Sequence, residues 1–289
     1  MTAEGLQVVD AHVHFWDPSV LRYPWLAELP ALRRAFLPSD FAPLRSRSVD
    51  AVIFVEANCA PDQAALEVEW VERLAEEEPR IAGIVAFVDL LDEPRRGDAL
   101  ARLGRSSRVV GVRHNIQNQP RGFAIQPAFV RGVGDVGARG LPFDLCITAD
   151  QLAEAVELVE QSPETRFVLD HCGKPAIRDD AFSEWAGQLE RLAAHERVSC
   201  KLSGLLTESR PDQRDVRGLA PYLEHALACF GPTRVIYGSD WPVCVLGGGA
   251  EQWRAVVEET TAAWSESDRR ALFAENAARF YRLPVAVDG

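Results

Sequence analysis

Four side chains that can transfer protons or bind a metal ion stand at three separate places in the chain: His12, His14, His171 and Asp240. His12 and His14 are two residues apart, a spacing that puts both imidazoles on one face of a β-strand. Two such imidazoles can hold a divalent ion, and His171 can add a third nitrogen ligand or donate a hydrogen bond to a substrate. Asp240 can bind the same ion or accept a proton from an attacking water. This combination predicts hydrolysis at one centre.

Each of these residues also has a structural interpretation. Either histidine of the pair would fit a hydrogen-bonded core position, and Asp240 would fit a cap of the turn into Pro242. Cys146 and Cys172 are the cysteines best placed to replace a histidine as a zinc ligand. The position of each side chain in the folded protein decides between the structural and the functional interpretation.

The elements that must position these residues are visible in the apolar pattern of the chain. Eight runs rich in Val, Ile and Leu begin near Val8, Ala51, Ile81, Val109, Pro142, Arg166, Arg197 and Arg234. Between them, apolar positions three and four residues apart predict helices, for example over residues 62–78, 150–161, 180–195 and 212–230. Strands without a polar face that alternate with helices predict a parallel sheet covered by helices.

A closed (β/α)₈ barrel is the α/β fold that this pattern favours. The rival is an open doubly wound sheet, but that fold needs a glycine-rich phosphate loop after its first strand, and residues 10–16 contain no glycine. Barrels commonly have about 250 residues in one domain, so a single domain is expected over residues 1–289. In such barrels the active site forms at the carboxyl ends of the strands.

The predicted strand ends add further polar candidates. Glu56 follows the second strand, Arg113 ends the fourth with Asn115 just beyond, and Lys201 lies on the seventh. A lone carboxylate inside an apolar strand is costly unless it has a purpose, which favours Glu56 as a site residue. Arg113, Lys201 and Lys174, which follows the sixth strand, fit a ligand contact or an ordinary ion pair equally well. Asp170 is expected to point away from His171 and to be structural.

Two connections look long enough to cover the mouth of the barrel. Residues 16–40 contain four prolines, too many for a continuous helix, and the segment is too long for a plain connector. Residues 117–127 have the same character, and the tail over residues 284–289 is expected to fray.

Composition excludes some partners. A formal net charge of −12 argues against nucleic acid, which draws its non-specific affinity from clustered Lys and Arg. No apolar run approaches the roughly 20 residues that span a bilayer, and the first ten residues lack the pattern of a secretory signal. The six cysteines show no CxxC pair and are expected as buried free thiols, so a cytoplasmic location without membrane contact is predicted.

Four motifs together resemble the amidohydrolase-related sugar-lactonase family, which includes L-fuconolactonases and L-rhamnonolactonases. They are Val9-Asp-Ala-His-Val-His-Phe-Trp-Asp-Pro, Phe167-Val-Leu-Asp-His-Cys-Gly-Lys-Pro, Cys200-Lys-Leu-Ser-Gly and Tyr237-Gly-Ser-Asp-Trp-Pro. The resemblance spans nearly the whole chain. It implies a distorted, amidohydrolase-like TIM barrel that opens a lactone ring with water, a carboxylic-ester hydrolase in which Asp240 is the base.

The resemblance also implies the ligand set of a metal site. The family's two-histidine motif falls on His12 and His14, and its strand-six histidine falls on His171. The chain lacks a lysine or glutamate in strand four and a histidine in strand five, the groups expected of a two-metal site. At most one ion, zinc or manganese, is therefore implied at His12, His14, His171 and Asp240, and a metal-independent site is the alternative.

A neutral sugar lactone is the substrate that this resemblance implies. Trp16, Tyr23, Trp25 and Trp241 would offer aromatic faces to the ring, while Glu56, Arg113, Asn115 and Lys201 would bind its hydroxyls. Two rival functions remain: a zinc-dependent decarboxylase of an aromatic or muconate-type acid, and a catalytically silent barrel that binds a sugar acid. Assembly into a homo-oligomer is also left open.

Overall fold

The computed structural model describes residues 8–46 and 48–283, so the predicted frayed tail lies outside the described residues. Within them, eight parallel strands form one sheet in the order of the sequence. The strands are β1 Val9–Val13, β2 Ala51–Val55, β3 Ile81–Phe87, β4 Val109–Arg113, β5 Phe143–Leu145, β6 Phe167–Leu169, β7 Val198–Leu202 and β8 Val235–Tyr237. Each begins within one residue of its predicted position, which confirms the strand assignment.

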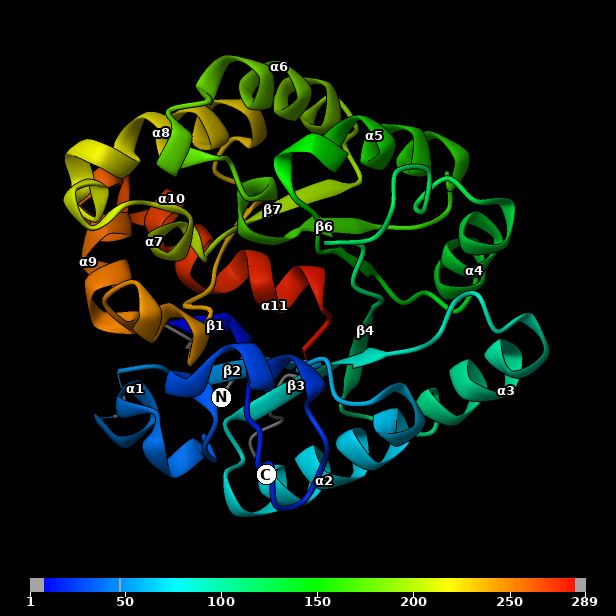
Figure 1. Cartoon of the computed structure of the whole chain (residues 1–289). Coiled ribbons are helices and arrows are strands. Elements are labelled where there is room, and N and C mark those ends of the chain that lie inside the picture. Colours follow the sequence, from blue (N-terminus) through cyan, green and yellow to red (C-terminus); the bar gives the residue numbers. More distant parts are fainter. Residues whose placement is uncertain (1–7, 47, 284–289) are drawn as a thin grey trace.

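The sheet curls into a nearly closed barrel because the chain beyond β8 returns to β1. The Trp241 carbonyl accepts a hydrogen bond from the His14 amide at 2.7 Å, and the Asp240 amide donates to the His12 carbonyl at 2.9 Å. These bonds bring both ends of the sheet together at its carboxyl edge (Figure 1). The predicted (β/α)₈ barrel is confirmed.

Helices surround the barrel in Figure 1. The longer ones are α2 Ala64–Glu77, α3 Glu93–Leu103, α4 Pro127–Gly137, α5 Leu152–Gln161, α6 Phe182–Ala193, α8 Val216–Phe230 and α9 Ala250–Thr260. The shorter ones are α1 Ala42–Ser46, α7 Leu205–Glu208, α10 Glu266–Arg270 and α11 Asn276–Phe280. The four helices predicted from periodicity correspond to α2, α5, α6 and α8. None of the helices in the described part of the chain is long and apolar enough to cross a membrane.

The end of the barrel opposite the carboxyl edge is closed by the last helical segment, a π-helical turn over Ala271–Glu275 that continues into α11. Tyr281 follows α11 and is 2% exposed. Its hydroxyl donates to Asp144 Oδ2 on β5 at 2.9 Å. The apolar residues of this segment pack with barrel residues of β1 and β2 in one buried cluster. This end of the barrel is therefore closed by buried apolar side chains together with the Tyr281–Asp144 hydrogen bond.

The proline-rich segment over residues 16–40 folds into three short 3₁₀ helices, Pro24–Glu28, Pro30–Leu32 and Pro38–Asp40, each beginning with a proline. The segment is closed by paired backbone hydrogen bonds between Trp16 and Phe36 at 3.0 and 2.8 Å. The Trp25 indole donates to the Ala57 carbonyl, just beyond β2, at 2.8 Å. The segment therefore lies across the carboxyl edge of the barrel, as predicted.

Candidate active site

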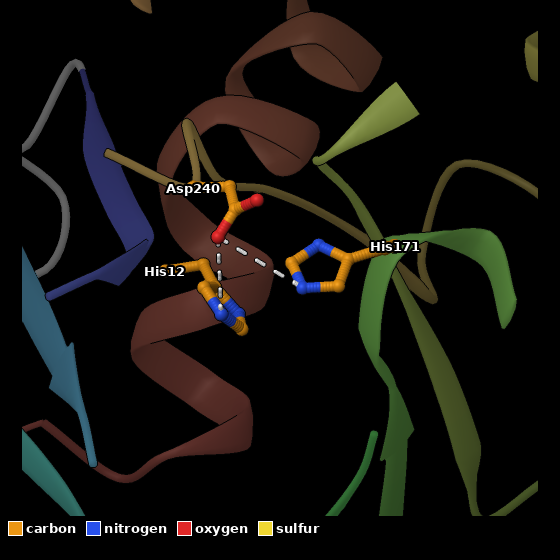
Figure 2. A group of neighbouring side chains, drawn as sticks. All are labelled: His12, His171 and Asp240. Carbon is orange, nitrogen blue, oxygen red and sulfur yellow. Dashed lines mark ion pairs between the residues drawn. The ribbon is translucent and has the colours of Figure 1, made fainter. Parts of the chain in front are cut away.

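Three imidazoles converge on one carboxylate at the carboxyl edge of the barrel. The Nε2 atoms of His14, His12 and His171 lie 3.5, 3.8 and 3.9 Å from Asp240 Oδ1. Figure 2 shows Asp240 directed at the space between the rings of His12 and His171. These distances exceed those of ordinary hydrogen bonds, so the four polar groups face a common point without saturating one another. We refer to these four residues, whose role in catalysis is a proposal, as the catalytic centre.

The histidines of β1 are held by close backbone contacts. The Nδ1 atom of His14 lies 2.7 Å from the Val55 carbonyl oxygen. A carbonyl only accepts, so Nδ1 carries a proton, and Nε2 is the ring nitrogen that faces Asp240. Gly238 leaves room for His12, because a Cβ there would lie 2.7 Å from the His12 Cβ. Both constraints aim the rings into the barrel.

His171 is aimed by a backbone turn rather than by a strand. It follows β6 within the turn Asp170–Gly173 and has a left-handed φ of 54°. Its Nδ1 is 2.8 Å from Ser203 Oγ, and a Cβ at Gly204 would lie only 2.6 Å from that nitrogen. Asp170 was expected to point away, but the left-handed turn breaks the strand alternation. Asp170 and His171 both face the barrel interior, and that expectation is corrected.

Burial sets the protonation states of the centre. It holds the pKa of His12 and of His171 well below the usual value, so both rings are neutral at neutral pH. Burial would raise the pKa of Asp240, but its interactions with His171, His14 and the Lys174 ammonium outweigh burial, and the pKa is lowered. Asp240 is therefore an ionised carboxylate beside the neutral rings of His12 and His171, the state that a general base or a metal ligand requires.

The donor atoms fit one divalent ion. The atoms that His12, His171 and Asp240 offer lie within 4.8 Å of one another. Neighbouring ligands of a tetrahedral zinc ion, with bonds of about 2.1 Å, are roughly 3.4 Å apart. The buried His12 Nε2 has no hydrogen-bond partner among the described residues, so an ion would satisfy it. The group contains neither His14 nor a cysteine.

Beneath the centre, Lys201 lies in a network of buried charges. Its Nζ is 2.6 Å from Asp144 Oδ2, 3.0 Å from Asp170 Oδ1 and 3.2 Å from His12 Nδ1. Burial would lower the pKa of this ammonium, but Asp144 and Asp170 raise it. Lys201 is fully buried and does not line the cavity, which corrects its expected contact with substrate.

Arg113 and Glu56 continue this network to the cavity wall. The Arg113 Nε donates to Glu56 Oε1 at 2.6 Å, and its Nη2 donates to the Glu56 carbonyl at 2.6 Å. A third guanidinium contact reaches Asp170 Oδ2 at 3.3 Å. The residues Glu56, Arg113, Asp144, Asp170, Lys201 and Tyr281 are called the ion network below. In it, two cations pair with three carboxylates, and Tyr281 donates a hydrogen bond to Asp144.

A cavity of about 750 Å³ opens over the catalytic centre. His14, His171 and Asp240 line it, together with the predicted residues Trp25, Glu56, Arg113 and Asn115. Trp16, Tyr23 and Trp241 do not line it, which corrects their expected contact with a sugar. Trp16 is fully buried with its indole bonded to backbone carbonyls of Leu32 and Arg34, and its ring packs beside Tyr23. Trp241 packs against Phe15, Phe36 and Phe41.

Other lining residues were missed by the sequence analysis. Glu28 comes from the proline-rich segment and Gln117 from the predicted arm after β4. Lys174, for which a ligand contact and an ion pair were equally expected, lines the cavity from the turn after β6. Ser203, which orients His171 from behind, was also missed as a site residue. The one available signal was the motif around each residue: Lys174 belongs to the His-Cys-Gly-Lys-Pro sequence, and Ser203 to Cys-Lys-Leu-Ser-Gly. No periodicity indicates which motif residue faces the cavity.

Comparisons with known proteins agree with this geometry. A sequence model of the amidohydrolase family matches residues 9–283. The chain is 36% identical to an L-fucono-1,5-lactonase of Burkholderia multivorans, over 98% of this chain and 99% of that protein. It is 33% identical to an L-fucono-1,5-lactonase of Burkholderia ambifaria, over 95% of both. A crystal structure of a Burkholderia multivorans amidohydrolase with bound zinc is 34% identical and superposes with a TM-score of 0.86, over 96% of this chain and 99% of that one.

Proposed function

Because the chain belongs to the amidohydrolase family, we propose that it hydrolyses a sugar lactone to the corresponding sugar acid. The observation that carries the proposal is the catalytic centre: three imidazoles converge on the ionised Asp240 at the floor of a cavity with room for a sugar lactone. The two relatives at 36% and 33% identity are L-fucono-1,5-lactonases, so L-fucono-1,5-lactone is the first substrate to test.

In the proposed reaction, Asp240 accepts a proton from a water molecule as the water oxygen attacks the lactone carbonyl carbon. A new carbon–oxygen bond forms, and the ring carbon–oxygen bond then breaks. The proton held by Asp240 passes to the departing ring oxygen, which becomes a hydroxyl group. The sugar acid that results ionises at neutral pH. Asp240 is consequently the residue that connects both halves of the reaction.

The imidazoles and the cavity wall assist this proton transfer. His171 and His12 stay neutral because of burial, and they flank the carboxylate without neutralising it. Glu56 and Asn115 line the wall and offer hydrogen-bonding groups to sugar hydroxyls, and the Trp25 ring borders the same cavity. Arg113 is held by Glu56, so its role is to orient that carboxylate.

We further propose that His12, His171 and Asp240 can hold one zinc ion, with His14 beside them. A bound ion would polarise the lactone carbonyl as a Lewis acid and lower the pKa of a bound water. Lactones are more reactive than amides, so the centre can also act through its own residues. Cytoplasmic location, a single domain over residues 1–289 and a possible homo-oligomer stay predictions.

The test is a panel of aldonolactones that includes L-fucono-1,5-lactone, followed through a pH indicator that detects the released acid. Half of the wells contain a metal chelator and half contain added Zn²⁺. Acid release from at least one lactone supports the proposal. Release of carbon dioxide from aromatic acids without lactone turnover would favour the decarboxylase, and ligand binding without any turnover would favour the silent barrel.

A further inference from the structure

Lys174 is a cavity cation that the proposed mechanism leaves without a role. Its ammonium lines the cavity and donates a hydrogen bond to the amide oxygen of Gln117, on the opposite wall segment. Among residues 8–46 and 48–283, no carboxylate lies within ion-pair distance of it. Arg113, the other cation of the wall, is paired with Glu56 at 2.6 Å and Asp170 at 3.3 Å. Lys174 is therefore the cation of the wall that no described carboxylate contacts, although its charge acts at longer range on Asp240 and Glu208.

The backbone places Lys174 beside His171 at a conformational cost. Residues 171–174 have φ angles of 54°, 52°, 71° and 48°, which is one turn of left-handed 3₁₀-like helix. The Lys174 amide closes the turn on the His171 carbonyl at 2.8 Å. With about three residues per turn, residues 171 and 174 lie on the same side. Left-handed backbone is unfavourable for residues other than glycine, and such strain is concentrated at functional sites.

Packing maintains this turn. The Trp185 indole, on α6, donates to the Cys172 carbonyl at 2.8 Å, and the Cys172 thiol donates to the Lys201 carbonyl at 3.5 Å. Cys172 thus faces the core, while His171 and Lys174 face the cavity. One strained turn delivers both a group of the catalytic centre and the free cation.

The charge balance of lactone hydrolysis explains what such a cation would bind. The lactone is neutral, but its product carries a carboxylate, and negative charge already develops on the carbonyl oxygen as water attacks. The cavity presents the Asp240 carboxylate on its floor and Glu28 at its rim, and both repel that charge. A cation without a carboxylate partner is the group that can offset this repulsion.

We infer that Lys174 is a substrate-contacting residue that binds the carboxylate of the sugar acid and the charge developing on the same oxygens during ring opening. Its ammonium exchanges the Gln117 amide oxygen for a carboxylate oxygen when the acid forms. The role of Lys174 during ring opening rests on the proposed lactone hydrolysis. Its binding of the aldonate carboxylate can be measured without turnover.

The experiment compares each aldonate with its neutral aldose by titration calorimetry, beginning with L-fuconate and L-fucose. The variants are Lys174→Met, Lys174→Arg and Gln117→Glu. The last variant keeps the Lys174 ammonium but gives it a carboxylate partner at position 117. Arg178→Met is the matched control, because Arg178 is exposed, four residues further on, and bonded to the Thr207 carbonyl outside the cavity. Kinetic constants on the preferred lactone complete the set.

The wild-type protein should bind an aldonate at least about 10-fold more tightly than the matched aldose, since a hydrogen bond to a charged group contributes a factor of roughly 10 to 100. Lys174→Met and Gln117→Glu should abolish that preference and leave aldose affinity within about threefold. Lys174→Arg should retain part of the preference for the aldonate, and Arg178→Met should retain the full preference. On the lactone, Lys174→Met should lower kcat about 100-fold, the effect of losing one oxyanion donor.

The two proposals fail in different ways. If the wild-type protein hydrolyses no lactone but prefers aldonates through Lys174, the proposed hydrolysis is wrong and the carboxylate site stands. If the wild type binds no aldonate better than its aldose, or if Lys174→Met weakens both equally, the carboxylate site is wrong whether or not lactones are hydrolysed.

Discussion

The barrel interior contains two sets of ionisable residues, and they differ in whether their charged groups are in direct contact with one another. In the ion network, Lys201 meets Asp144 at 2.6 Å and Arg113 meets Glu56 at 2.6 Å. In the catalytic centre just above, the three imidazole nitrogens stop 3.5 to 3.9 Å from Asp240. The cations of the network are paired with carboxylates inside the protein, whereas the polar groups of the centre face a common point and can still bind a water, an ion or a substrate. Substitutions should therefore affect stability in the first set and activity in the second.

Asp240→Asn should give the largest effect and change activity alone. Loss of a general base lowers turnover by up to about 10⁴-fold, equivalent to roughly 5 kcal/mol of transition-state stabilisation. The amide is isosteric, so the thermal midpoint should stay within a few degrees of the wild type. The measurement is lactone turnover beside circular dichroism melting, with Asp212→Asn as an exposed control. Near-normal turnover of Asp240→Asn would remove Asp240 from the mechanism.

Lys201→Met tests the other set and should change stability. Removing one partner of a buried ion pair leaves an uncompensated charge, which typically costs about 3–5 kcal/mol. Urea unfolding should reveal this loss, whereas Lys174→Met, in the half-exposed cavity wall, should unfold within about 1 kcal/mol of the wild type. Equal stability of both variants would contradict the distinction between network and cavity.

Zinc should stabilise the protein through the catalytic centre. An ion present at 100 times its dissociation constant adds about 2.7 kcal/mol, or roughly 5 °C in the thermal midpoint. The shift should vanish in His171→Asn and persist in His195→Asn, whose side chain lies after α6 and away from the centre. The readout is the melting temperature with Zn²⁺ against chelator. A shift that survives His171→Asn would locate the ion elsewhere.

Glu67→Gln should have the smallest effect, and its sign depends on pH. Burial, followed by the charge of Glu56, raises the pKa of Glu67 to about 8. A carboxyl whose pKa is higher in the folded state favours folding below its ordinary value near 4.5, and this contribution is lost as pH rises through about 8. The glutamine variant lacks that dependence and can still accept the Ala57 amide bond.

At pH 8, Glu67→Gln should therefore melt above the wild type by a few degrees, about 1 kcal/mol or more, and the difference should shrink or reverse at pH 5. Melting curves at both pH values measure this. The exposed control is Glu69→Gln, on the same helix, for which no pH-dependent difference is expected. A constant offset between Glu67→Gln and wild type at all pH values would show that Glu67 is ionised in the folded protein.

Local sequence predicts much of the fold, because apolar runs, helical periodicity and prolines act on residues that are close together in the chain. The apolar runs predict the first residue of each of the eight strands to within one position, and a proline begins each of the three 3₁₀ helices of residues 16–40 across the barrel mouth. The spacing of His12 and His14 puts two imidazoles at one strand end. Together with Asp240 after β8, this spacing predicts the centre from residue types and positions alone.

The sequence by itself thus determined the barrel, its polar edge and the residues that meet there. Tertiary structure decided which charged and aromatic residues face the cavity. Lys201 and Lys174 stand in equally suggestive motifs, but Lys201 is fully buried against Asp144 and Asp170, while a left-handed turn brings Lys174 into the cavity. The periodicity of apolar residues does not indicate such a turn. The charge pairing of Lys201 is equally hidden in the local sequence, because its partner Asp144 is 57 positions away. Whether a side chain is neutralised or free to bind is a property of that packing.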